Sequence, residues 1–459
     1  MNTVQSASNV LDYMDESFFL DFRAQGHGPM IQFVWIYDHD VDYEGLRRFH
    51  QSLGKGLLGR CVEDSPLPGG RSRWVRWSPP DDFEIAGRGR PRSDIPEWID
   101  EQSAILIDIE SGPPWRLAVQ PLLEGGAAVT LVVGHGVADG VGMSDAVADA
   151  VNGTGVDFGY PPANSRTRPQ ALFRDLRQFF RDVPQMAKAF MLAPRAAKQL
   201  PLRPRPGLGR QIVYREKGSK AVTVRSSEAL GLARLPALAV LIPTEHWDQV
   251  AESLGGTSNS LLIGLTLKLC DNLGWLDSQG LANVTIPINE RIPGDTRGNA
   301  LTGAAMVFDP AKATDLKGIR ATVRSKLSEL DDMRRFVLGP LPLTPLVPKM
   351  IANRFQDVLF KSSNITCSHA GDLDPATNRP DGTDAERFFA RQARAPELFS
   401  RALLKRVGGV FFPIASGRLA GHVYISICYS DADASMTRER LRDVVSDALG
   451  TFDLTAEMI

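Results

Sequence analysis

Apolar and polar positions along the chain follow the two periods that are typical of strands and helices. Residues 29–53 begin with an apolar run, pass through a polar break that contains Asp40 and Asp42, and end with helical spacing. This pattern predicts a strand and then a helix capped by one of the two aspartates. Residues 71–77 alternate between polar and apolar, which predicts a strand with one exposed face, and residues 94–109 favour a helix.

A β-hairpin is predicted next. The segments "PWRLAVQPL" and "AAVTLVVGH" flank the turn residues 124–126. Both faces of the second segment are apolar, so we expect this strand to be covered on both sides. It leads into "LVVGHGVADGVGM" (131–143), where His135 and Asp139 lie between the strand and a short helix that ends near Gly153.

The second half of the chain has a loosely similar pattern. Thr244 is the expected cap of a helix that follows a strand at 237–243. A strongly apolar helix is predicted at 258–274. The other expected elements are strands at 283–289 and 301–309 and within 358–371 and 408–436, and helices near 312–335 and at 437–452. These patterns are compatible with two α/β lobes of similar build.

A helical pattern at 171–200 separates the two halves. Pro184 and Pro194 predict breaks in this helix, and 201–210 is expected to be extended. Segment 171–210 contains nine Arg or Lys, two Asp and several aromatic side chains. Two interpretations stay open. The helix connects the lobes and solvates its arginines, or it lies on anionic lipid, although Pro184 interrupts the apolar face that lipid requires.

Composition narrows the class of protein. A length of 459 residues suggests two domains, and a formal net charge of −2 gives no indication of nucleic-acid binding. Four distant cysteines without a CxxC pair fit a reducing compartment, without disulfides or a thiolate metal site. The first residues lack the features of a secretory signal, and no apolar run reaches the ~20 residues of a membrane span. We therefore expect a cytoplasmic protein.

His135 is the strongest candidate for chemistry. It follows a buried strand, where a rigid scaffold can position a functional group. Gly134, Gly136 and Gly140 remove side chains around the imidazole, so a substrate can approach closely. A neutral imidazole suits general-base catalysis on a hydroxyl or an amine. Two other interpretations of the HxxxDG pattern are a helix cap at Asp139 beside a hydrogen-bonded loop histidine, and a pair of metal ligands that lacks a third.

The stretch "GHGVADG" (134–140) resembles the HHxxxDG motif of the CoA-dependent acyltransferase superfamily. That superfamily includes chloramphenicol acetyltransferase, peptide-synthetase condensation domains and bacterial wax ester synthase/diacylglycerol acyltransferases. Looser similarity to the wax ester synthase branch extends over almost the whole chain. It is carried by "LDYMDESFFL" (11–20) with its Met-Asp pair, "RSRWVRWSPPDDFEI" (71–85), "TSNSLLIGLTLKL" (257–269), "TIPINERIPGDTRGNALTGAAMVF" (285–308) and "KSSNITCSHAG" (361–371).

The resemblance implies an α/β fold of two chloramphenicol-acetyltransferase-like lobes that form a V with a central tunnel. We expect an N-terminal lobe over 1–165, a connector over 166–215 and a C-terminal lobe over 216–459. The resemblance also implies that His135 deprotonates an acceptor, which then attacks an acyl thioester without a covalent enzyme intermediate. Asp139 is expected to pair with Arg291 and to shape the loop.

Three departures from the family pattern mark a divergent member. Gly134 stands where the first motif histidine is found, and the Asn-Asp pair has become Asn259-Ser260. His369 enters the altered Ser-Asn turn. The resemblance makes Gly140 a close neighbour of the thioester. It gives candidate tunnel or loop roles to Gly134, Asn259, Asn299 and His369.

Three functions stay open at this point. The first is transfer of an acyl group from acyl-CoA, a co-substrate rather than a permanently bound cofactor, to a hydroxyl of an alcohol, an acylglycerol or a natural product. The second is a condensation-type reaction with a carrier-protein thioester that forms an ester or an amide. The third is a catalytically silent binding protein. The expected partners are the thioester and a small-molecule or lipid acceptor, with no metal and no nucleic acid. Peripheral membrane contact and a carrier protein remain open.

Overall fold

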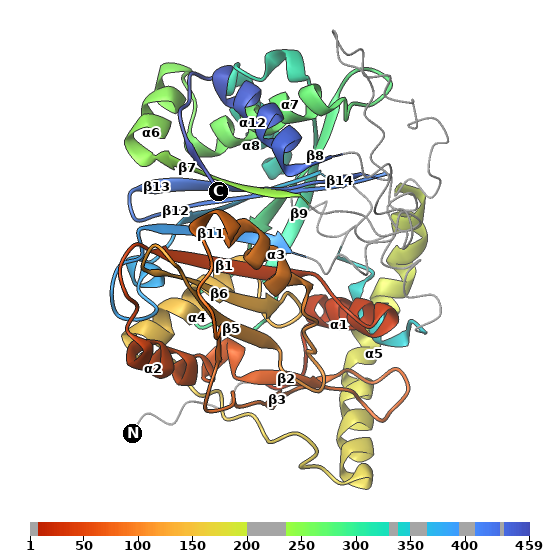
Figure 1. Cartoon of the computed structure of the whole chain (residues 1–459). Coiled ribbons are helices and arrows are strands. Elements are labelled where there is room, and N and C mark those ends of the chain that lie inside the picture. Colours follow the sequence, from red (N-terminus) through yellow and green to blue (C-terminus); the bar gives the residue numbers. More distant parts are fainter. Residues whose placement is uncertain (1–7, 200–235, 330–337, 349–364, 394–408, 432–435) are drawn as a thin grey trace, which may run out of the picture.

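Two β-sheets, one in each lobe, form the framework of the molecule (Figure 1). The computed structural model describes residues 8–199, 236–329, 338–348, 365–393, 409–431 and 436–459. The fold is mixed α/β, as predicted. The predicted central tunnel stays a prediction.

The five-stranded sheet of the N-terminal lobe has the order β11-β1-β6-β5-β4. Its strands are β1 (Met30–Tyr37), β4 (Glu84–Ile85), β5 (Trp115–Pro121), β6 (Ala127–Gly134) and β11 (Arg387–Ala393). Strands β5 and β6 form the predicted antiparallel hairpin. Every residue of β1 and β6 is buried, which confirms the expected cover on both faces of β6.

Helices and a small ribbon complete this lobe. They are α1 (Tyr13–Gln25), α2 (Tyr43–Leu53), α3 (Ile95–Ala104), α4 (Gly140–Asn152), and the pair of β2 (Arg60–Glu63) and β3 (Arg73–Arg76). Asp42 caps α2, as one of the two predicted candidates. Helix α3 is shorter than the predicted 94–109. It ends at Ala104, and the isoleucines at 107 and 109 instead pack in the core of the lobe.

The connector is one long helix, α5 (Arg168–Gln199). The predicted breaks at Pro184 and Pro194 are therefore wrong. Pro184 lies on the exposed side of α5. A proline at such a position removes one backbone hydrogen bond, and water can donate to the carbonyl that is left over. The predicted extended segment 201–210 lies outside the described residues.

The eight-stranded sheet of the C-terminal lobe follows the order β15-β7-β13-β12-β10-β8-β9, and β14 pairs with β12. Its strands are β7 (Ala237–Pro243), β8 (Ala282–Asn289), β9 (Leu301–Phe308), β10 (Ile365–Asp372), β12 (Val410–Leu419), β13 (His422–Cys428), β14 (Ser430–Asp431) and β15 (Glu457–Met458). The helices α6 (Thr244–Ser253), α7 (Ser258–Leu273), α8 (Leu316–Ser328) and α12 (Arg438–Gly450) cover the face away from the N-terminal lobe (Figure 1).

Thr244 is the first residue of α6 and not its cap, which corrects the prediction. Pro243 occupies the cap position, and no side chain caps this helix. The first turn of α6 instead follows directly from the end of β7, and the backbone N–H of Thr244 donates to the carbonyl of Gly421. A tertiary hydrogen bond thus replaces the local cap that the sequence predicts.

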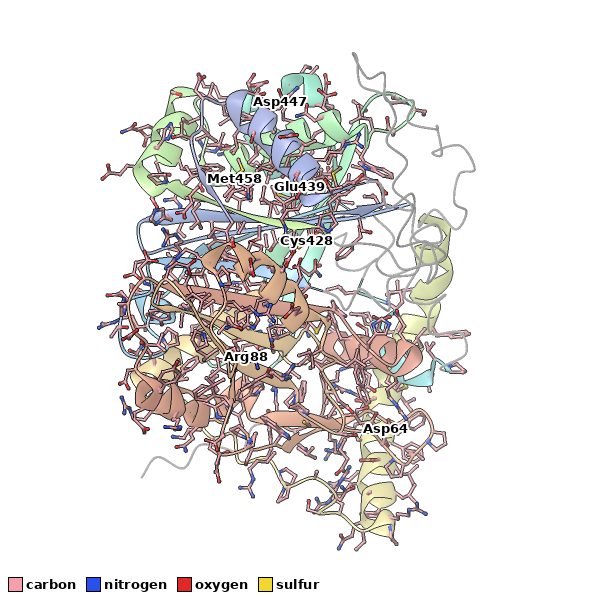
Figure 2. All side chains as sticks on the ribbon, viewed as in Figure 1. Asp64, Arg88, Cys428, Glu439, Asp447 and Met458 are labelled. Atoms are coloured by element: carbon pink, nitrogen blue, oxygen red, sulfur yellow. The ribbon has the colours of Figure 1, made fainter. Side chains whose placement is uncertain are left out.

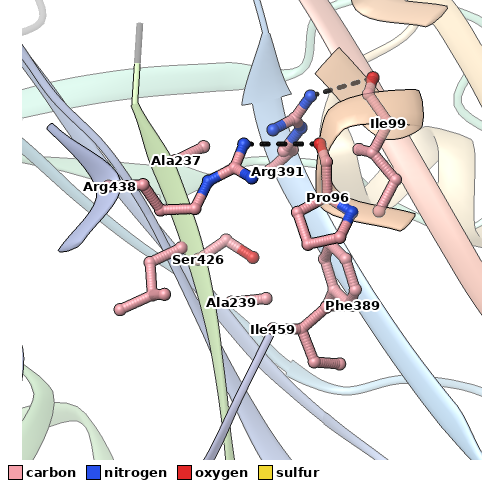
Figure 3. Close-up of a pocket in the computed structure, with 10 residues that line it drawn as sticks. Pro96, Ile99, Ala237, Ala239, Phe389, Arg391, Ser426, Arg438 and Ile459 are labelled. Atoms are coloured by element: carbon pink, nitrogen blue, oxygen red, sulfur yellow. Dashed lines mark hydrogen bonds between the residues drawn. The ribbon is translucent and has the colours of Figure 1, made fainter. Parts of the chain in front are cut away.

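Strand β11 joins the two lobes. It comes from the C-terminal half of the sequence, yet it pairs with β1 at the edge of the N-terminal sheet, from Met30 opposite Ala393 to Ile36 opposite Arg387. It also contacts β12 and β13 of the other sheet. Cys428 of β13 lies between the lobes (Figure 2), where its thiol donates to the Gln392 carbonyl.

None of the described helices combines the length and the apolar character that crossing a membrane would require. The predicted lobe limits of 1–165, 166–215 and 216–459 stay a prediction. The crossing of β11 means that the N-terminal sheet is built from two distant parts of the chain.

Candidate functional site

The predicted motif forms the link between β6, which ends at Gly134, and α4, which begins at Gly140. His135 is half-buried at the start of this link. Its backbone N–H donates to the carbonyl of Pro29 at 2.9 Å. The ring of Phe18 from α1 stacks on the imidazole, with 5.0 Å between centroids and 11° between planes. Backbone and ring contacts together fix where the imidazole lies.

Asn299, from the loop between β8 and β9, lies at the edge of this imidazole and favours one tautomer of the neutral ring. Its Nδ2 donates to the backbone carbonyl of His135 at 2.9 Å, so this end of the amide is the NH2 group. The opposite end, Oδ1, lies 2.9 Å from Nδ1 of His135. An amide oxygen only accepts, so Nδ1 of the neutral imidazole carries the proton and Nε2 carries the lone pair.

Asp15 of α1 holds Asn299 in turn. Oδ1 of this carboxylate accepts from the backbone N–H of Asn299 at 2.7 Å and from its Nδ2 at 3.2 Å, and Oδ2 accepts from the N–H of Gly298 at 2.9 Å. Complete burial raises the pKa of Asp15 to about 7, although the charge of Arg60 and these hydrogen bonds favour the carboxylate. Three segments, α1, the motif link and the β8–β9 loop, therefore meet at one amide.

The predicted ion pair between Asp139 and Arg291 is present. Nη2 of Arg291 lies 2.8 Å from Oδ2 of Asp139, and both side chains are 6% exposed. Oδ1 of the same carboxylate accepts from the N–H of Gly142 at 2.7 Å and so caps α4, and Oδ2 accepts from Ala300 N–H at 2.8 Å. Asp139 is thus both the helix cap that the residues alone suggested and the partner that the resemblance implied.

A second buried arginine forms hydrogen bonds to both the motif link and the β8–β9 loop. Arg60 of β2 donates to the carbonyl of Thr296 at 2.6 Å and to that of Val137 at 3.0 Å. Its guanidinium lies 3.8 Å from the ring centroid of Trp74 and is fully buried. The motif link and the β8–β9 loop are therefore joined by two guanidinium groups, Arg60 and Arg291, besides the amide of Asn299.

Gly134 and Gly140, at the two ends of the motif, have different surroundings. A Cβ on Gly134 would lie 2.6 Å from Cγ2 of Ile109 and 3.1 Å from that of Ile107, so isoleucines already fill the space beside this position. A Cβ on Gly140 would meet no atom of the described residues within 4 Å, apart from its chain neighbours and the backbone of its own helix. The surroundings of Gly140 leave room for another molecule, whereas a side chain at 134 would need the isoleucines to move.

Two other predicted site residues, Asn259 and His369, belong to the C-terminal lobe, and their site roles stay predictions. Asn259 is half-buried in the first turn of α7, in the helical layer away from the N-terminal lobe. His369 in β10 shares its strand face with Ile365 and Cys367, which pack in the C-terminal core. Burial, and then the charge of Arg418, lower the pKa of His369. Among the contacts of the described residues, none joins either side chain to His135.

Sequence reasoning did not select Asp15, Phe18 or Arg60. Asp15 had a signal, because it is the aspartate of the Met-Asp pair that carries the N-terminal resemblance. Phe18 follows one helical turn later and therefore lies on the same side of α1. Arg60 carried no signal, since only the folded structure brings it to residues 137 and 296.

Comparison with protein-family models and with curated protein sequences finds no match. Solved structures do match over almost the full length. The first condensation domain of the CDA synthetase aligns with a TM-score of 0.57 and 13% identity, over 97% of this chain and 95% of that domain. The wax ester synthase/diacylglycerol acyltransferase from Marinobacter aquaeolei VT8 aligns with a TM-score of 0.55 and 13% identity, over 97% and 98%.

The chain has the two-lobed condensation and acyltransferase fold. A cyclization-docking bidomain from Sorangium cellulosum also aligns, with a TM-score of 0.52 and 14% identity, over 97% of this chain and 84% of the bidomain. The resemblance found in the motifs is thus confirmed at the level of the fold, and the low identity fits a divergent member. Identity this low leaves substrate and activity to be inferred from the site itself.

Proposed function

We propose that the protein transfers an acyl group from acyl-CoA to a hydroxyl acceptor, with His135 as the general base. The observation that supports this proposal is the orientation of the Asn299 amide, whose oxygen faces Nδ1 and so favours the neutral tautomer that is protonated there. The acyltransferase fold supports the same chemistry. A base that must accept a proton at Nε2 requires this tautomer.

The proposed step balances as follows. Nε2 of His135 takes the proton of the acceptor hydroxyl while the oxygen attacks the thioester carbonyl. The tetrahedral adduct then collapses and its C–S bond breaks. The sulfur leaves with the proton that Nε2 carries, so the products are an ester and a thiol and the imidazole is neutral again. A positioned base of this kind typically contributes about 10²–10⁴ in rate.

Asn299 and Asp15 are positioning residues in this scheme. When His135 becomes an imidazolium, the hydrogen bond from Nδ1 to Oδ1 of Asn299 turns into a charge-assisted one. Above about pH 7, where Asp15 is ionised, its carboxylate accepts from Nδ2 of the same amide and polarises Asn299 toward the imidazole. Both effects stabilise the charged intermediate more than the resting state, which is the condition for faster catalysis.

A carrier-protein thioester is the alternative donor. The condensation domain that shares the fold comes from a synthetase, and the same base would act on either thioester. The open surroundings of Gly140 fit the thioester end that the two donors have in common. The donors differ only beyond the pantetheine arm, so a direct comparison of the two separates them.

The test measures thiol release from acyl-CoA of increasing chain length with a panel of alcohols, acylglycerols and amines, together with mass detection of the product. We expect acceptor-dependent release in the wild type and a 10²–10⁴-fold lower rate in His135→Ala. His422→Ala is the matched control, because the imidazole of His422 contacts the carbonyl of Ala420 in its own hairpin turn of the C-terminal lobe. Its rate should equal that of the wild type.

Three outcomes decide between the functions. Equal rates in the wild type and in His135→Ala would remove the proposed base. Release with a carrier-protein thioester but not with acyl-CoA would assign the alternative donor. Binding of both substrates without product in the wild type would leave the catalytically silent protein.

A further inference from the structure

Helix α5 has three distinct faces along its length. One face packs on the rest of the protein, because its side chains are buried at helical spacings of three, four or seven residues: Ala171, Asp175, Asp182, Met186 and Ala189. The other two faces are exposed. The continuity of α5 through Pro184 aligns these faces from residue 171 to residue 191.

The second face is apolar, although it is exposed. Phe173 is 71% exposed, Phe180 66%, Phe190 73% and Met191 68%. Three further apolar side chains of this face are also exposed: Leu172, Leu176 and Val183. Phe179 is half-buried. We call the exposed members of this set, Leu172, Phe173, Leu176, Phe180, Val183, Phe190 and Met191, the apolar ridge. It extends about 29 Å at 1.5 Å per residue.

The third face is basic. Arg174, Arg177, Arg181 and Lys188 are exposed and follow one another at helical spacing beside the apolar ridge. The only carboxylates of α5 are Asp175 and Asp182, and both belong to the buried face. The outward surface of this part of α5 thus carries four cations and no carboxylate.

Internal ion pairs hold those two carboxylates in place. Oδ1 of Asp175 lies 2.8 Å from Nε of Arg73 and 3.2 Å from Nη1 of Arg166. Oδ1 of Asp182 accepts from Gln178 at 2.9 Å and lies 3.4 Å from Nη1 of Arg71. These contacts fix the rotation of the helix about its axis, so the apolar ridge and the basic face point outward together.

We propose that the apolar ridge and the basic face of α5 dock the protein on an anionic lipid surface. An amphipathic helix of this kind lies in the membrane interface, with aromatic and aliphatic side chains among the acyl chains and Arg and Lys at the anionic headgroups. Positive charge complements negative lipid, and each cation near such a surface strengthens binding about fivefold. A continuous exposed ridge of this size is otherwise unfavourable in water.

The shape of the surface favours lipid over a protein partner. The apolar side chains form a convex, nearly straight ridge, which a bilayer accepts without a complementary groove. An acidic protein would have to supply a groove of matching length. Helix α5 also packs against η4 (Leu341–Leu346), which packs against α1, the helix that carries Asp15. The docking surface is therefore linked to the candidate site through η4 and α1. The inference itself does not depend on acyl transfer.

The test uses the full chain in co-sedimentation with vesicles of phosphatidylcholine alone and with 30% phosphatidylglycerol. We expect at least tenfold tighter binding of the wild type to the anionic vesicles. The triple variant Phe173→Ser/Phe180→Ser/Phe190→Ser should lose at least tenfold in affinity for them. Arg174→Gln/Arg177→Gln/Arg181→Gln should lose most of the preference for anionic lipid.

A matched charge control lies on α8. Lys317→Gln/Arg320→Gln/Arg324→Gln removes three exposed cations from a helix of the other lobe and should change binding less than twofold. Equal Tm values for all variants exclude loss of fold as the cause. The proposal would be overturned if the wild type did not bind anionic vesicles, or if both α5 variants bound them as tightly as the wild type. Binding to an acidic carrier protein that is lost in the α5 variants, without vesicle binding, would assign the surface to a protein instead.

Discussion

Replacing Asn299 by alanine separates the orientation of the proposed base, His135, from the presence of its imidazole. The substitution removes the acceptor at Nδ1 of His135 and the two donors that Nδ2 directs to Asp15 and to the His135 carbonyl. The imidazole keeps its stacking on Phe18 and its backbone anchor at Pro29. The side chain of His135 therefore remains, while the group that decides its tautomer is lost.

The magnitude follows from the change in charge during the reaction. A neutral hydrogen bond contributes about 0.5–1.5 kcal/mol net, and one to a charged group about 1.5–3 kcal/mol. The bond from His135 to Asn299 is neutral at rest and charged in the intermediate, so its loss raises the barrier by about 1–1.5 kcal/mol, or about tenfold in rate. Molecules whose proton has moved to Nε2 are inactive in addition. We expect kcat to fall about 10–100-fold, less than for His135→Ala.

The assay is steady-state thiol release at saturating donor and acceptor, combined with ¹⁵N NMR of histidine-labelled protein to identify the protonated nitrogen. Asn272→Ala is the control, since Asn272 on α7 donates to Asp447 on α12 at 2.8 Å, in the outer layer of the other lobe. A kcat for Asn299→Ala within twofold of the wild type, in a protein that His135→Ala inactivates, would refute the role assigned to the amide.

Two further predictions concern the loops around the base. Gly142→Ala places a Cβ 2.7 Å from Nη2 of Arg291 and should destabilise the protein by about 1–3 kcal/mol in urea unfolding. Gly140→Ala, whose Cβ meets no other described segment within 4 Å, should leave stability unchanged and raise KM for the thioester. Equal effects of the two substitutions on stability would contradict this geometry. The pKa of Asp15 is raised to about 7 by burial, so its contribution to stability is complete below about pH 4 and is lost as the pH rises toward 7. The difference in unfolding free energy between the wild type and Asp15→Asn should therefore decline by roughly 4 kcal/mol across that interval, and a difference that stays constant would show that the carboxylate is already ionised at low pH.

The elements that sequence patterns predicted are those whose signal is local. The β5–β6 hairpin, the burial of β6 and the cap of α2 by Asp42 follow from neighbouring residues. The errors occur where contacts between distant parts of the chain determine the secondary structure. Strand β11 was not predicted because its role depends on β1, more than 350 residues earlier in the chain. Helix α5 continues through Pro184 because its buried face is anchored on the N-terminal lobe, which outweighs one missing hydrogen bond.

In the candidate site, too, local motifs could be predicted from the sequence, whereas some contacts between distant segments could not. His135 and Asp139 belong to one short motif, and the resemblance pointed to Arg291 and Asn299 in a second segment. The pairing of Asp139 with Arg291 could therefore be predicted and is present. The link from Asn299 to Asp15 could not be derived from spacing, because the two residues are 284 positions apart. Only their shared backbone and side-chain hydrogen bonds connect them.

The absence of the first motif histidine now has a physical explanation. The space beside Gly134 is filled by Ile107 and Ile109, so no cavity is left there. The orientation of His135 comes from residues outside the motif: Phe18 at the face of the ring and Asn299 at its edge. A histidine at 134 would have to displace the isoleucines and would add nothing to either contact. The loop can therefore lose that residue and still hold the imidazole in the tautomer that general-base catalysis requires.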